Sequence, residues 1–532
     1  MNRKTLIYLL LILAVAAALR LAALNRIPYG VFIDEGVNGV EGIQAIRSGH
    51  FHLYYPANFT EGPFVTLIGF SETIFGVNQF ALRLVPALAG VLTVLVTFFF
   101  ARRLYSDGVA VFAAWFMATG FWHLLFSRLA INAAIFVPLF LVMSVYFLRL
   151  GMDQLSAEPG SSSRMRWWGW VLLAGTSYGL GFYTYLPFRA TPLLLMLIFL
   201  LDLQRRRKHE QALGPWLRTF AFFVLVALIV TVPLANYFLH HPEQLTLRMT
   251  QKLSVTDDPH PVRAEIKILR RTLGMFNLHG DENWRHNISG RPELTAPVGI
   301  FALAGFFMTF AHALRKRWQA PNEWMLLGWF AIMLLPETLT YEGIPHSMRA
   351  IGVVVPVYLF AGIGADSAFG AARNKIWLKA LLVILIVATA VYDARLYFRN
   401  WGKHPAHVFM QTFSQRQADE SGFLNSLPAS TPRFVISDEG PISPLHSDPA
   451  VAAEVDYHMA MRAQTVAFGT MDNVHPVFMD IEEAMKQSPA RFPAGSVIVA
   501  LEGRASTLEA LQKQGVNLQI LQKPSFAYAV VR

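Results

Sequence analysis

Long apolar runs recur along most of the chain and limit, more than any other feature, what it can fold into. About eleven of them approach the roughly 20 residues that a helix needs to cross a bilayer. They cover residues 6–24, 82–101, 109–126, 131–148, 168–185, 186–201, 216–237, 296–314, 324–340, 350–368 and 376–391. Composition agrees, because 15% of the 532 residues are charged, whereas a soluble globular chain carries about 25%. The sequence therefore predicts an α-helical polytopic membrane protein with about 11 transmembrane helices.

The basic residues of the predicted loops indicate how the chain is oriented. Clusters of Lys and Arg lie at residues 3–4, 102–103, 149–166, 205–208, 315–317 and 373–375, on one side of the alternating path. Because positive residues concentrate in cytoplasmic loops, we expect the N-terminus inside and the tail outside, in a prokaryotic plasma membrane. The clusters also account for the net charge of +10. No basic stripe with interleaved aromatics indicates nucleic acid as a partner, so membrane lipids are the expected surroundings.

Three loops and the tail fall on the outer side in this topology. The loops cover about 25–82, 238–295 and 341–349, and the first contains a short apolar stretch, 64–75, that suggests a helix lying on the interface. The tail has strand-length apolar runs at 434–437, 465–468, 496–501, 518–521 and 527–531, with a helical pattern at 506–514. We therefore expect a transmembrane domain over 1–397 and a small extracytoplasmic α/β domain over 398–532.

Asp34 and Glu35 stand side by side just after the first predicted span. Adjacent carboxylates are costly near lipid, which makes the pair a functional-site hypothesis. The alternative is the solvated first turn of a helix, where acidic residues are favoured. The functional interpretation is favoured if other residues of the predicted outer loops can form a binding site with this pair.

Cations lie at several outer turns, where the charge bias of membrane proteins disfavours them. Arg128 and Arg189 follow predicted spans, and Arg349 lies three residues after His346 in the third loop. Arginine fits phosphate through a planar, bidentate set of donors, so these residues suggest an anionic ligand such as a lipid phosphate. For each one taken singly, the alternative is a side chain that snorkels to the headgroups.

One carboxylate and a few cations are enough for glycosyl transfer from a lipid phosphate. The phosphate is already a good leaving group, so the reaction needs a base for the acceptor's proton and cations for the departing charge. Asp34 is the candidate base of an inverting transfer, and Glu35 would orient it or bind a metal. A divalent metal held by Glu35, Glu61, His50 and His52 is a second hypothesis, and no other cofactor is indicated.

The chain resembles the GT-C glycosyltransferases of the protein O-mannosyltransferase and aminoarabinose-transferase type. The motifs that carry the resemblance lie at 33–35, 55–63, 75–90, 101–105, 127–128, 179–189, 280–287, 290–292 and 346–349, within about 6–368. The resemblance implies a membrane enzyme that uses a polyprenyl-phosphate-linked monosaccharide on the extracytoplasmic side. It implies Asp34 as the catalytic carboxylate, Glu35 beside it, and Glu61 and Tyr55 in the substrate-binding element of the first loop.

The same resemblance assigns the lipid phosphate to outer-loop cations. In the aminoarabinose-transferase type a Lys follows the first-loop Glu, but this chain has Gly62 there. Arg349 or Arg128 would have to replace that contact, with Arg189 and His346 as further candidates for donor binding. The acceptor, whether protein, lipid or glycan, is not indicated.

Two other functions compete with transfer. A secondary transporter places ionisable residues near mid-membrane and breaks helices in paired halves, whereas the predicted spans here carry little internal charge. A non-catalytic assembly protein of the envelope explains the topology, but not the joint presence of the carboxylate pair, Glu61 and the outer arginines.

Overall fold

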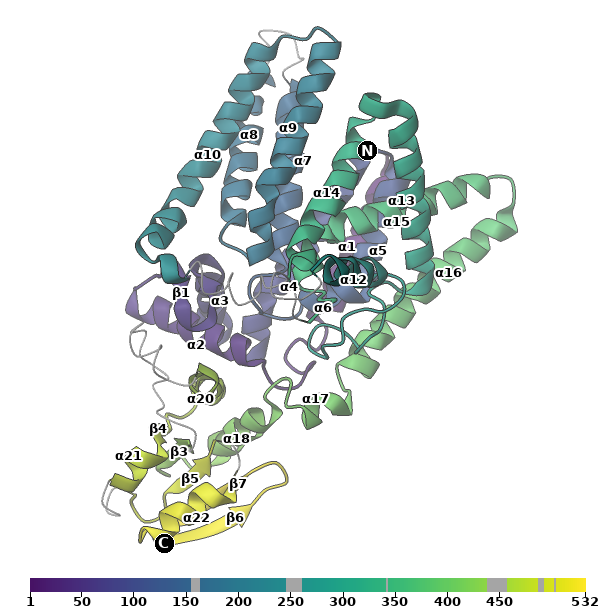
Figure 1. Cartoon of the computed structure of the whole chain (residues 1–532). Coiled ribbons are helices and arrows are strands. Elements are labelled where there is room, and N and C mark those ends of the chain that lie inside the picture. Colours follow the sequence, from purple (N-terminus) through teal and green to yellow (C-terminus); the bar gives the residue numbers. More distant parts are fainter. Residues whose placement is uncertain (155–162, 245–260, 341–342, 438–456, 487–491, 502–503) are drawn as a thin grey trace. The chain divides into compact units, whose positions relative to one another are not determined.

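The computed structural model describes residues 1–154, 163–244, 261–340, 343–437, 457–486, 492–501 and 504–532. Parts of the second and third predicted outer loops, 245–260 and 341–342, lie outside these ranges. The described chain is mostly helical (Figure 1) and forms two compact units. Unit 1 comprises Met1–Ala22, Pro86–Leu129 and Ala133–Trp401, and unit 2 comprises Ala23–Val85, Ala130–Asn132 and Gly402–Arg532.

Eight helical segments of the described chain are long and apolar enough to cross a membrane. They are α1 (Arg3–Leu21), α4 (Gln79–Leu104), α7 (Phe136–Gln154), η2 with α9 (Leu186–Ala190, Thr191–Lys208), α10 (Leu213–His240), α13 with η4 (Ala296–Lys316, Arg317–Gln319), η5 with α15 (Arg349–Val353, Val354–Ala371) and α16 with the segment up to Val408 (Ile376–Arg395). The predicted class, a polytopic helical membrane protein, is confirmed. The remaining predicted spans coincide with α5 (Asp107–Thr119) and α6 (Phe121–Phe126), α8 (Ser163–Gly181) and α14 (Pro321–Thr338).

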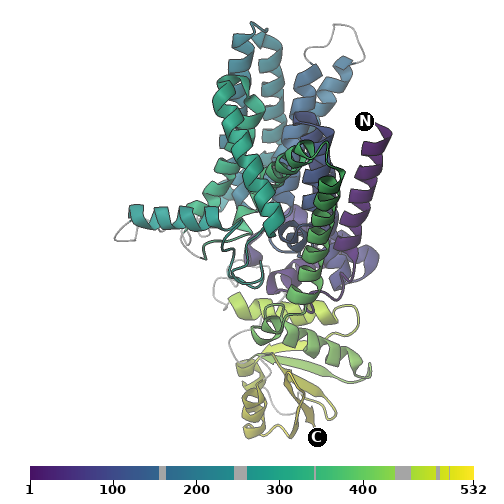
Figure 2. The same cartoon turned by 90° about the vertical axis from the view of Figure 1, so that its right-hand side faces the viewer.

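Small residues allow the helices of unit 1 to pack closely. A Cβ at Gly305 of α13 would collide with the carbonyl of Phe360 on α15, and a Cβ at Gly364 of α15 would collide with the carbonyl of Phe301. Glycines on both helices therefore bring the two backbones together, as in other membrane helix pairs. The helices α7, α8 and α10 also lie side by side (Figures 1 and 2).

In unit 2, the first loop folds into a helix pair joined by a small hairpin. The order is α2 (Ile33–Ser48), β1 (Tyr54–Tyr55), η1 (Pro56–Asn58), β2 (Thr60–Glu61) and α3 (Gly62–Phe75), with Tyr54 paired to Glu61 across the hairpin. The apolar stretch predicted as a helix at 64–75 lies in α3. Gly42 of α2 faces Gly69 of α3, and a Cβ at either would meet the backbone of the other helix.

The tail forms a mixed five-stranded sheet in the order β4-β3-β5-β7-β6. The strands are β3 (Arg433–Ser437), β4 (Val477–Asp480), β5 (Val497–Ala500), β6 (Leu518–Gln522) and β7 (Ala527–Val531). β3 runs parallel to β4 and β5, and β7 runs antiparallel to β5 and β6. Four predicted strands and the helix α22 (Ala505–Lys513) are confirmed.

The prediction of a fifth strand in the tail, at 465–468, is wrong. These residues lie in the helix α20 (Tyr457–Thr470). A short apolar run is compatible with a buried strand and with a buried helix segment, and the neighbouring β4 begins at Val477 instead. The shorter helices of this unit are α17 (Pro405–Phe409), α18 (Gln415–Ser426) and α21 (Ile481–Lys486), and unit 1 also contains α12 (Pro261–Gly274) and the π-helix η6 (Leu396–Trp401).

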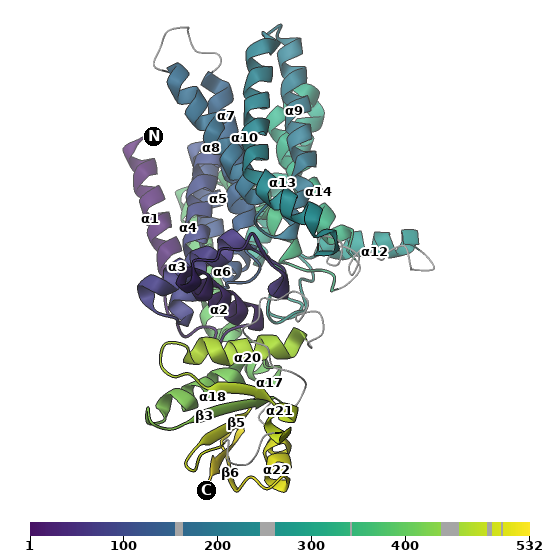
Figure 3. The same ribbon diagram turned by 90° about the vertical axis from the view of Figure 1, so that its left-hand side faces the viewer.

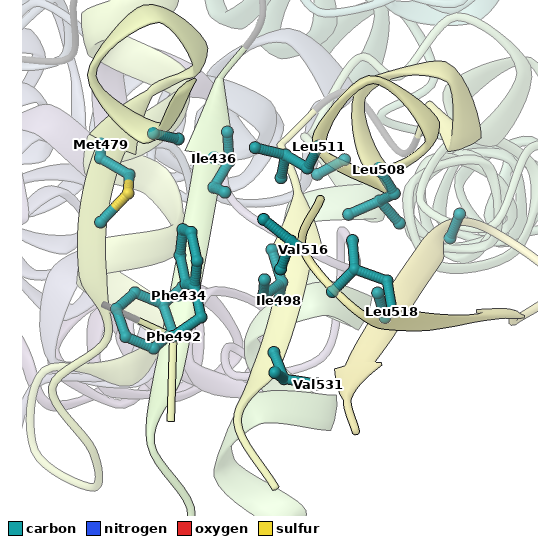
Figure 4. Close-up of a cluster of buried hydrophobic side chains, with 14 residues drawn as sticks. Phe434, Ile436, Met479, Phe492, Ile498, Leu508, Leu511, Val516, Leu518 and Val531 are labelled. Atoms are coloured by element: carbon teal, nitrogen blue, oxygen red, sulfur yellow. The ribbon is translucent and has the colours of Figure 1, made fainter. Parts of the chain in front are cut away.

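Both faces of the sheet are buried. Phe434 and Ile436 of β3 belong to one apolar cluster with Leu508 and Leu511 of α22 (Figure 4), whereas Val435 belongs to a second cluster on the opposite face. The second cluster includes residues of α18 and α20, which Figure 3 shows beside the sheet. A strand buried on both faces reads as a continuous apolar run, which is why β3 and β5 were predictable.

Candidate functional site

The carboxylate pair predicted from the sequence lies on the first turn of α2, and its two members have different surroundings. Glu35 is fully buried. Its Oε1 accepts hydrogen bonds from Arg83 Nε at 3.0 Å and Ala130 N at 2.9 Å, and its Oε2 accepts from Arg83 Nη2 at 2.8 Å and Phe32 N at 2.9 Å. Asp34 is partly exposed. Both carboxylate oxygens of Glu35 are therefore engaged in hydrogen bonds that stabilise the local fold.

Arg83 completes this buried ion pair from the start of α4. Its guanidinium is fully buried and also donates to the carbonyl oxygens of Pro28 at 2.9 Å and Gly30 at 2.7 Å. The fork of donors therefore joins the segment before α2, the first turn of α2 and the start of α4. Arg83 lies in a motif recognised in the sequence, but no site role was predicted for it.

The hairpin after α2 is tied to the same first turn. Asn58 donates from Nδ2 to the carbonyl oxygen of Asp34 at 3.1 Å and to Asn38 Oδ1 at 2.8 Å. Glu61, predicted to bind substrate, is buried at the end of the hairpin and directly precedes α3. The structure therefore brings Asp34 and the element 55–61 into one small assembly.

The partly exposed Glu41 and the buried Tyr55 add two polar groups to this assembly that the sequence did not single out as a pair. Among the described residues, neither Glu41 Oε2 nor the Tyr55 hydroxyl has a hydrogen-bond partner. Burial raises the pKa of Glu41 to about 8. Burial, with the nearby charge of Glu41, raises the pKa of Tyr55 to about 12. Asp34, Asn38 and Glu41 are spaced to share one face of α2.

The metal site predicted within the first loop has little support from these positions. The Glu35 oxygens are bound to Arg83, and His50 and His52 are both exposed. In the described part of the chain, the ligand atoms that do gather are those of Asp281, His286 and His346, which lie within 4.8 Å of one another.

This second group of residues belongs to unit 1. Asp281 and His286 come from the loop before α13, and His346 comes from the loop before η5. His286 Nδ1 donates to Asp281 Oδ2 at 3.2 Å, and the backbone N–H and hydroxyl of Ser347 donate to the same oxygen at 2.8 and 3.1 Å. The rings of His286 and His346 have centroids 4.5 Å apart.

Burial and hydrogen bonding shift the pKa values of Asp281 and His286. Burial alone would raise the pKa of Asp281, but hydrogen bonds from His286, Asn283 and Ser347 lower it below its ordinary value. Burial, together with the positive charges of Arg285 and Arg349, lowers the pKa of His286. An ionised carboxylate and a neutral imidazole are the forms in which these side chains bind divalent metals.

The three predicted phosphate-binding arginines lie in different surroundings. Arg349 begins η5, is 6% exposed, and its charge acts on His286 of the Asp-His-His group. Arg128 is fully buried and donates from Nη1 to the carbonyl oxygens of Leu19 at 2.9 Å and Arg20 at 2.6 Å, at the C-terminal end of α1. Arg189 is partly exposed in η2 and lies over the ring of Phe238. Only Arg349 belongs to a cluster of ionisable loop residues.

A basic helix outside the predicted set adds a further cationic surface. Arg263, Lys267, Arg270 and Arg271 of α12 line a pocket of ≈ 580 Å³ together with His279. Exposed Val262, Ile266, Leu269 and Leu273 accompany them on the same helix. Cations and apolar residues recurring at helical spacing are typical of a helix that binds a membrane surface, and this spacing was available in the sequence.

Asp281 and His286 were also missed as site residues, although both lie in a motif recognised at 280–287. The signal for them was a polar run with Asp and His in a predicted outer loop. It does not say which partner from another loop completes the group. His346 comes from a loop 60 residues later, and only the fold brings the three side chains together.

Comparisons with known proteins agree with this architecture. The family model for dolichyl-phosphate-mannose-protein mannosyltransferases matches residues 62–235. A comparison with curated proteins finds no match. ArnT from Cupriavidus metallidurans, solved with undecaprenyl phosphate, superposes with a TM-score of 0.55 at 14% identity and covers 99% of this chain and 98% of that chain. Its apo state gives a TM-score of 0.56 at 15% identity.

A second solved protein has a similar fold but a longer chain. The oligosaccharyltransferase from Archaeoglobus fulgidus, tethered to an acceptor peptide, superposes with a TM-score of 0.52 at 14% identity. The match covers 98% of this chain and 69% of that chain. The resemblance predicted from the sequence motifs is confirmed at the level of the fold: the chain has the fold of ArnT, and the mannosyltransferase family model matches part of it.

Proposed function

We propose that the chain is a membrane glycosyltransferase that moves a monosaccharide from a polyprenyl-phosphate donor to an acceptor on the extracytoplasmic side, with inversion at the anomeric carbon. ArnT of the same fold has been solved with undecaprenyl phosphate. This likeness supports a lipid-phosphate donor here. The proposal extends it to the reaction and to the residues that carry it.

The observation that carries the proposal is the division of roles between two adjacent carboxylates. Glu35 accepts four hydrogen bonds within a fully buried ion pair, whereas Asp34 is partly exposed on the same helical turn. The buried partner fixes the turn, so the exposed one is held in a defined place. A general base requires such positioning within reach of the acceptor's proton.

In the proposed reaction, the acceptor hydroxyl gives its proton to Asp34 while its oxygen bonds to the anomeric carbon. The bond from that carbon to the phosphate oxygen breaks, and its electron pair leaves with the polyprenyl phosphate. Cations stabilise the charge that builds on the departing phosphate. By the resemblance, Arg349 is the proposed source of this charge, and the cations of α12 are proposed to attract the anionic donor to the protein.

We further infer that Asp281, His286 and His346 bind a divalent cation such as Zn²⁺. A carboxylate and two imidazoles within 4.8 Å of one another are groups of the kind that zinc takes, and a bound cation would displace the hydrogen bond between His286 Nδ1 and Asp281 Oδ2. A bound cation would supply Lewis-acid charge for an anionic substrate group. We expect close to one zinc per purified chain by elemental analysis, and little zinc in a His286→Ala, His346→Ala double variant of equal thermal stability. Equal metal content in both proteins would contradict this assignment.

The experiment that tests the proposed function uses the purified protein in lipid with a panel of polyprenyl-phosphate monosaccharides. Release or transfer of labelled sugar is measured for the wild type, for Asp34→Asn and for Asp153→Asn. The last variant is a matched control, because Asp153 lies in an exposed ion pair with Arg103. Turnover of at least one donor by wild type and control, and its loss in Asp34→Asn, is the expected result. No turnover of any donor, or full turnover by Asp34→Asn, would overturn the proposal.

A further inference from the structure

Unit 2 contains a pocket that the proposed chemistry leaves unused. It has a volume of ≈ 390 Å³ and is lined by α18, α20 and two stretches of the first loop around residues 25–31 and 77–79. This volume lies within the range of about 300–1,000 Å³ that is typical of small-molecule sites. Residues far apart in the sequence therefore build one concave surface of ligand size.

The lining of this pocket is polar but uncharged. Amide side chains from Asn25, Asn78, Gln79, Asn425 and Asn473 line it, and among the described lining residues none is acidic or basic. Tyr29, Ser421 and Thr465 add hydroxyl groups, and Val31, Val77 and Phe468 add apolar surface. A phosphate or carboxylate ligand would find no counter-charge on this lining, whereas a neutral hydroxylated ligand would find donors, acceptors and apolar contacts.

Two acceptor atoms in the pocket lining lack an internal partner. Within the described ranges, Gln79 Oε1 and Asn425 Oδ1 are buried without a hydrogen bond. The amide nitrogen of Asn425 donates to the carbonyl oxygen of Gly469 at 2.8 Å, which fixes the side chain. A buried acceptor without a donor costs about 1–3 kcal/mol. Both atoms belong to residues that line the pocket, so a ligand hydroxyl that reaches either of them would supply the missing hydrogen bond.

We infer that this pocket binds an uncharged sugar unit of the acceptor. Sugar hydroxyls supply the donors that the two amide oxygens lack, and the C–H face of a sugar ring suits the apolar part of the lining. That the sugar belongs to an acceptor rests on the proposed glycosyl transfer. The binding of a neutral glycan to the pocket can be measured without any transfer.

Gly422 provides a way to fill the pocket while leaving its hydrogen-bonding groups unchanged. It lines the pocket from α18, and a Cβ built there meets nothing within 4 Å. Gly422→Trp should therefore occupy the pocket at little cost to the fold, and Gly422→Ala should leave it open. Gly370, at the end of α15, also has open space around its Cβ, so Gly370→Trp is a matched control that adds the same side chain elsewhere.

The test measures binding of mannotriose, maltotriose and chitotriose to the purified full-length protein in lipid, by saturation-transfer NMR and titration. Trigalacturonate and triglycine serve as charged and peptide probes. We expect at least one neutral trisaccharide to bind, about tenfold weaker binding to Gly422→Trp, and unchanged binding to Gly422→Ala and Gly370→Trp. If Gly422→Trp does not fold, Gln79→Met, which removes one acceptor without filling the pocket, is expected to weaken binding in its place.

Equal affinity of wild type and Gly422→Trp, or no binding of any neutral trisaccharide, would overturn the inference. Stronger binding of trigalacturonate or triglycine in the same pocket would also overturn it, because the ligand would then be of another class. Loss of trisaccharide binding in Gly422→Trp would support the pocket even if the wild type transferred no sugar. That combination would refute the proposed function alone.

Discussion

Two neighbouring residues with the same functional group, Glu35 and Asp34, lie in different surroundings in this chain. Glu35 and Arg83 form an ion pair with no exposed surface, and the backbone donors of Phe32 and Ala130 satisfy the carboxylate further. Asp34 retains partial exposure one residue away. The contrast predicts opposite phenotypes for two equally conservative substitutions.

We expect Asp34→Asn to lower sugar transfer by about 100-fold or more, the usual scale for a positioned general base. Folding and donor binding should stay near those of the wild type, because the buried ion pair is intact. Initial rates at saturating donor and acceptor, with donor affinity measured separately, check this prediction. Near-normal turnover would exclude Asp34 as the base.

Glu35→Gln makes the corresponding substitution at the buried carboxylate of the same helical turn. It leaves the Arg83 guanidinium buried without its counter-charge, which costs about 3–5 kcal/mol when one partner of a buried pair is removed. We therefore expect a lower unfolding temperature and a lower yield before any specific loss of rate. A Glu35→Gln protein as stable as the wild type but inactive would instead make Glu35 a participant in the chemistry.

Glu41 predicts a pH dependence of stability. Its pKa is raised by burial from 4.5 to about 8, so between these values the folded state keeps a proton that the unfolded state releases. Stability then falls as pH rises from about 4.5 to about 8 and levels off above that range. Glu41→Gln should remove this part of the fall and unfold at a higher temperature than wild type at pH 9, with a smaller difference at pH 5. Thermal unfolding at pH 5, 7 and 9 decides this, and parallel profiles for both proteins would contradict it.

At the scale of elements, the helix α12 presents cations and apolar residues at helical spacing. Its cations line one pocket, and its exposed apolar residues are spaced for contact with lipid. We expect Gln at Arg263, Lys267, Arg270 and Arg271 to weaken donor binding about tenfold and to reduce its dependence on salt, because exposed charges are screened by ions. Replacing the exposed tail cations Arg504, Lys513, Lys523 and Arg532 by Gln provides a control of equal charge change. The same loss of affinity in both quadruple variants would show a general charge effect and remove α12 from donor binding.

Elements were predictable where a single periodicity dominated. The membrane helices follow from apolar runs, and β3, β5, β6 and β7 follow from strand-length runs bounded by turns. The run at 465–468 was misassigned, because burial on a helix and burial on a strand select the same short apolar sequence. The candidate site was predictable only in part. Asp34, Glu61 and His346 carry local signals, whereas the Glu35–Arg83 pair and the Asp281–His286–His346 group depend on contacts between distant segments.

At the scale of the whole molecule, orientation in the membrane is the property that the proposed function needs most. The basic loops predict that Asp34 and the tail face away from the cytoplasm. The chain has no cysteine, so Ser426→Cys in the tail and Gln211→Cys in a basic loop can each be labelled singly. We expect an impermeant maleimide to label Ser426→Cys in intact cells and Gln211→Cys only after the membrane is opened. The reverse pattern would refute the orientation.

Unit 2 is built from distant segments of the chain, and this has a consequence for when its parts can fold during synthesis. Its helix α2 packs against α20, with Gly36 against Thr465 and Gly39 against Phe468, so the first loop finds its partner more than 400 residues later in the chain. At a synthesis rate of about 5–20 residues per second, the loop waits roughly 20–80 seconds for that partner. During this time the face of α2 that carries these glycines is uncovered. Nascent chains arrested before residue 457 should therefore be cut by protease within the first loop, while the finished chain resists.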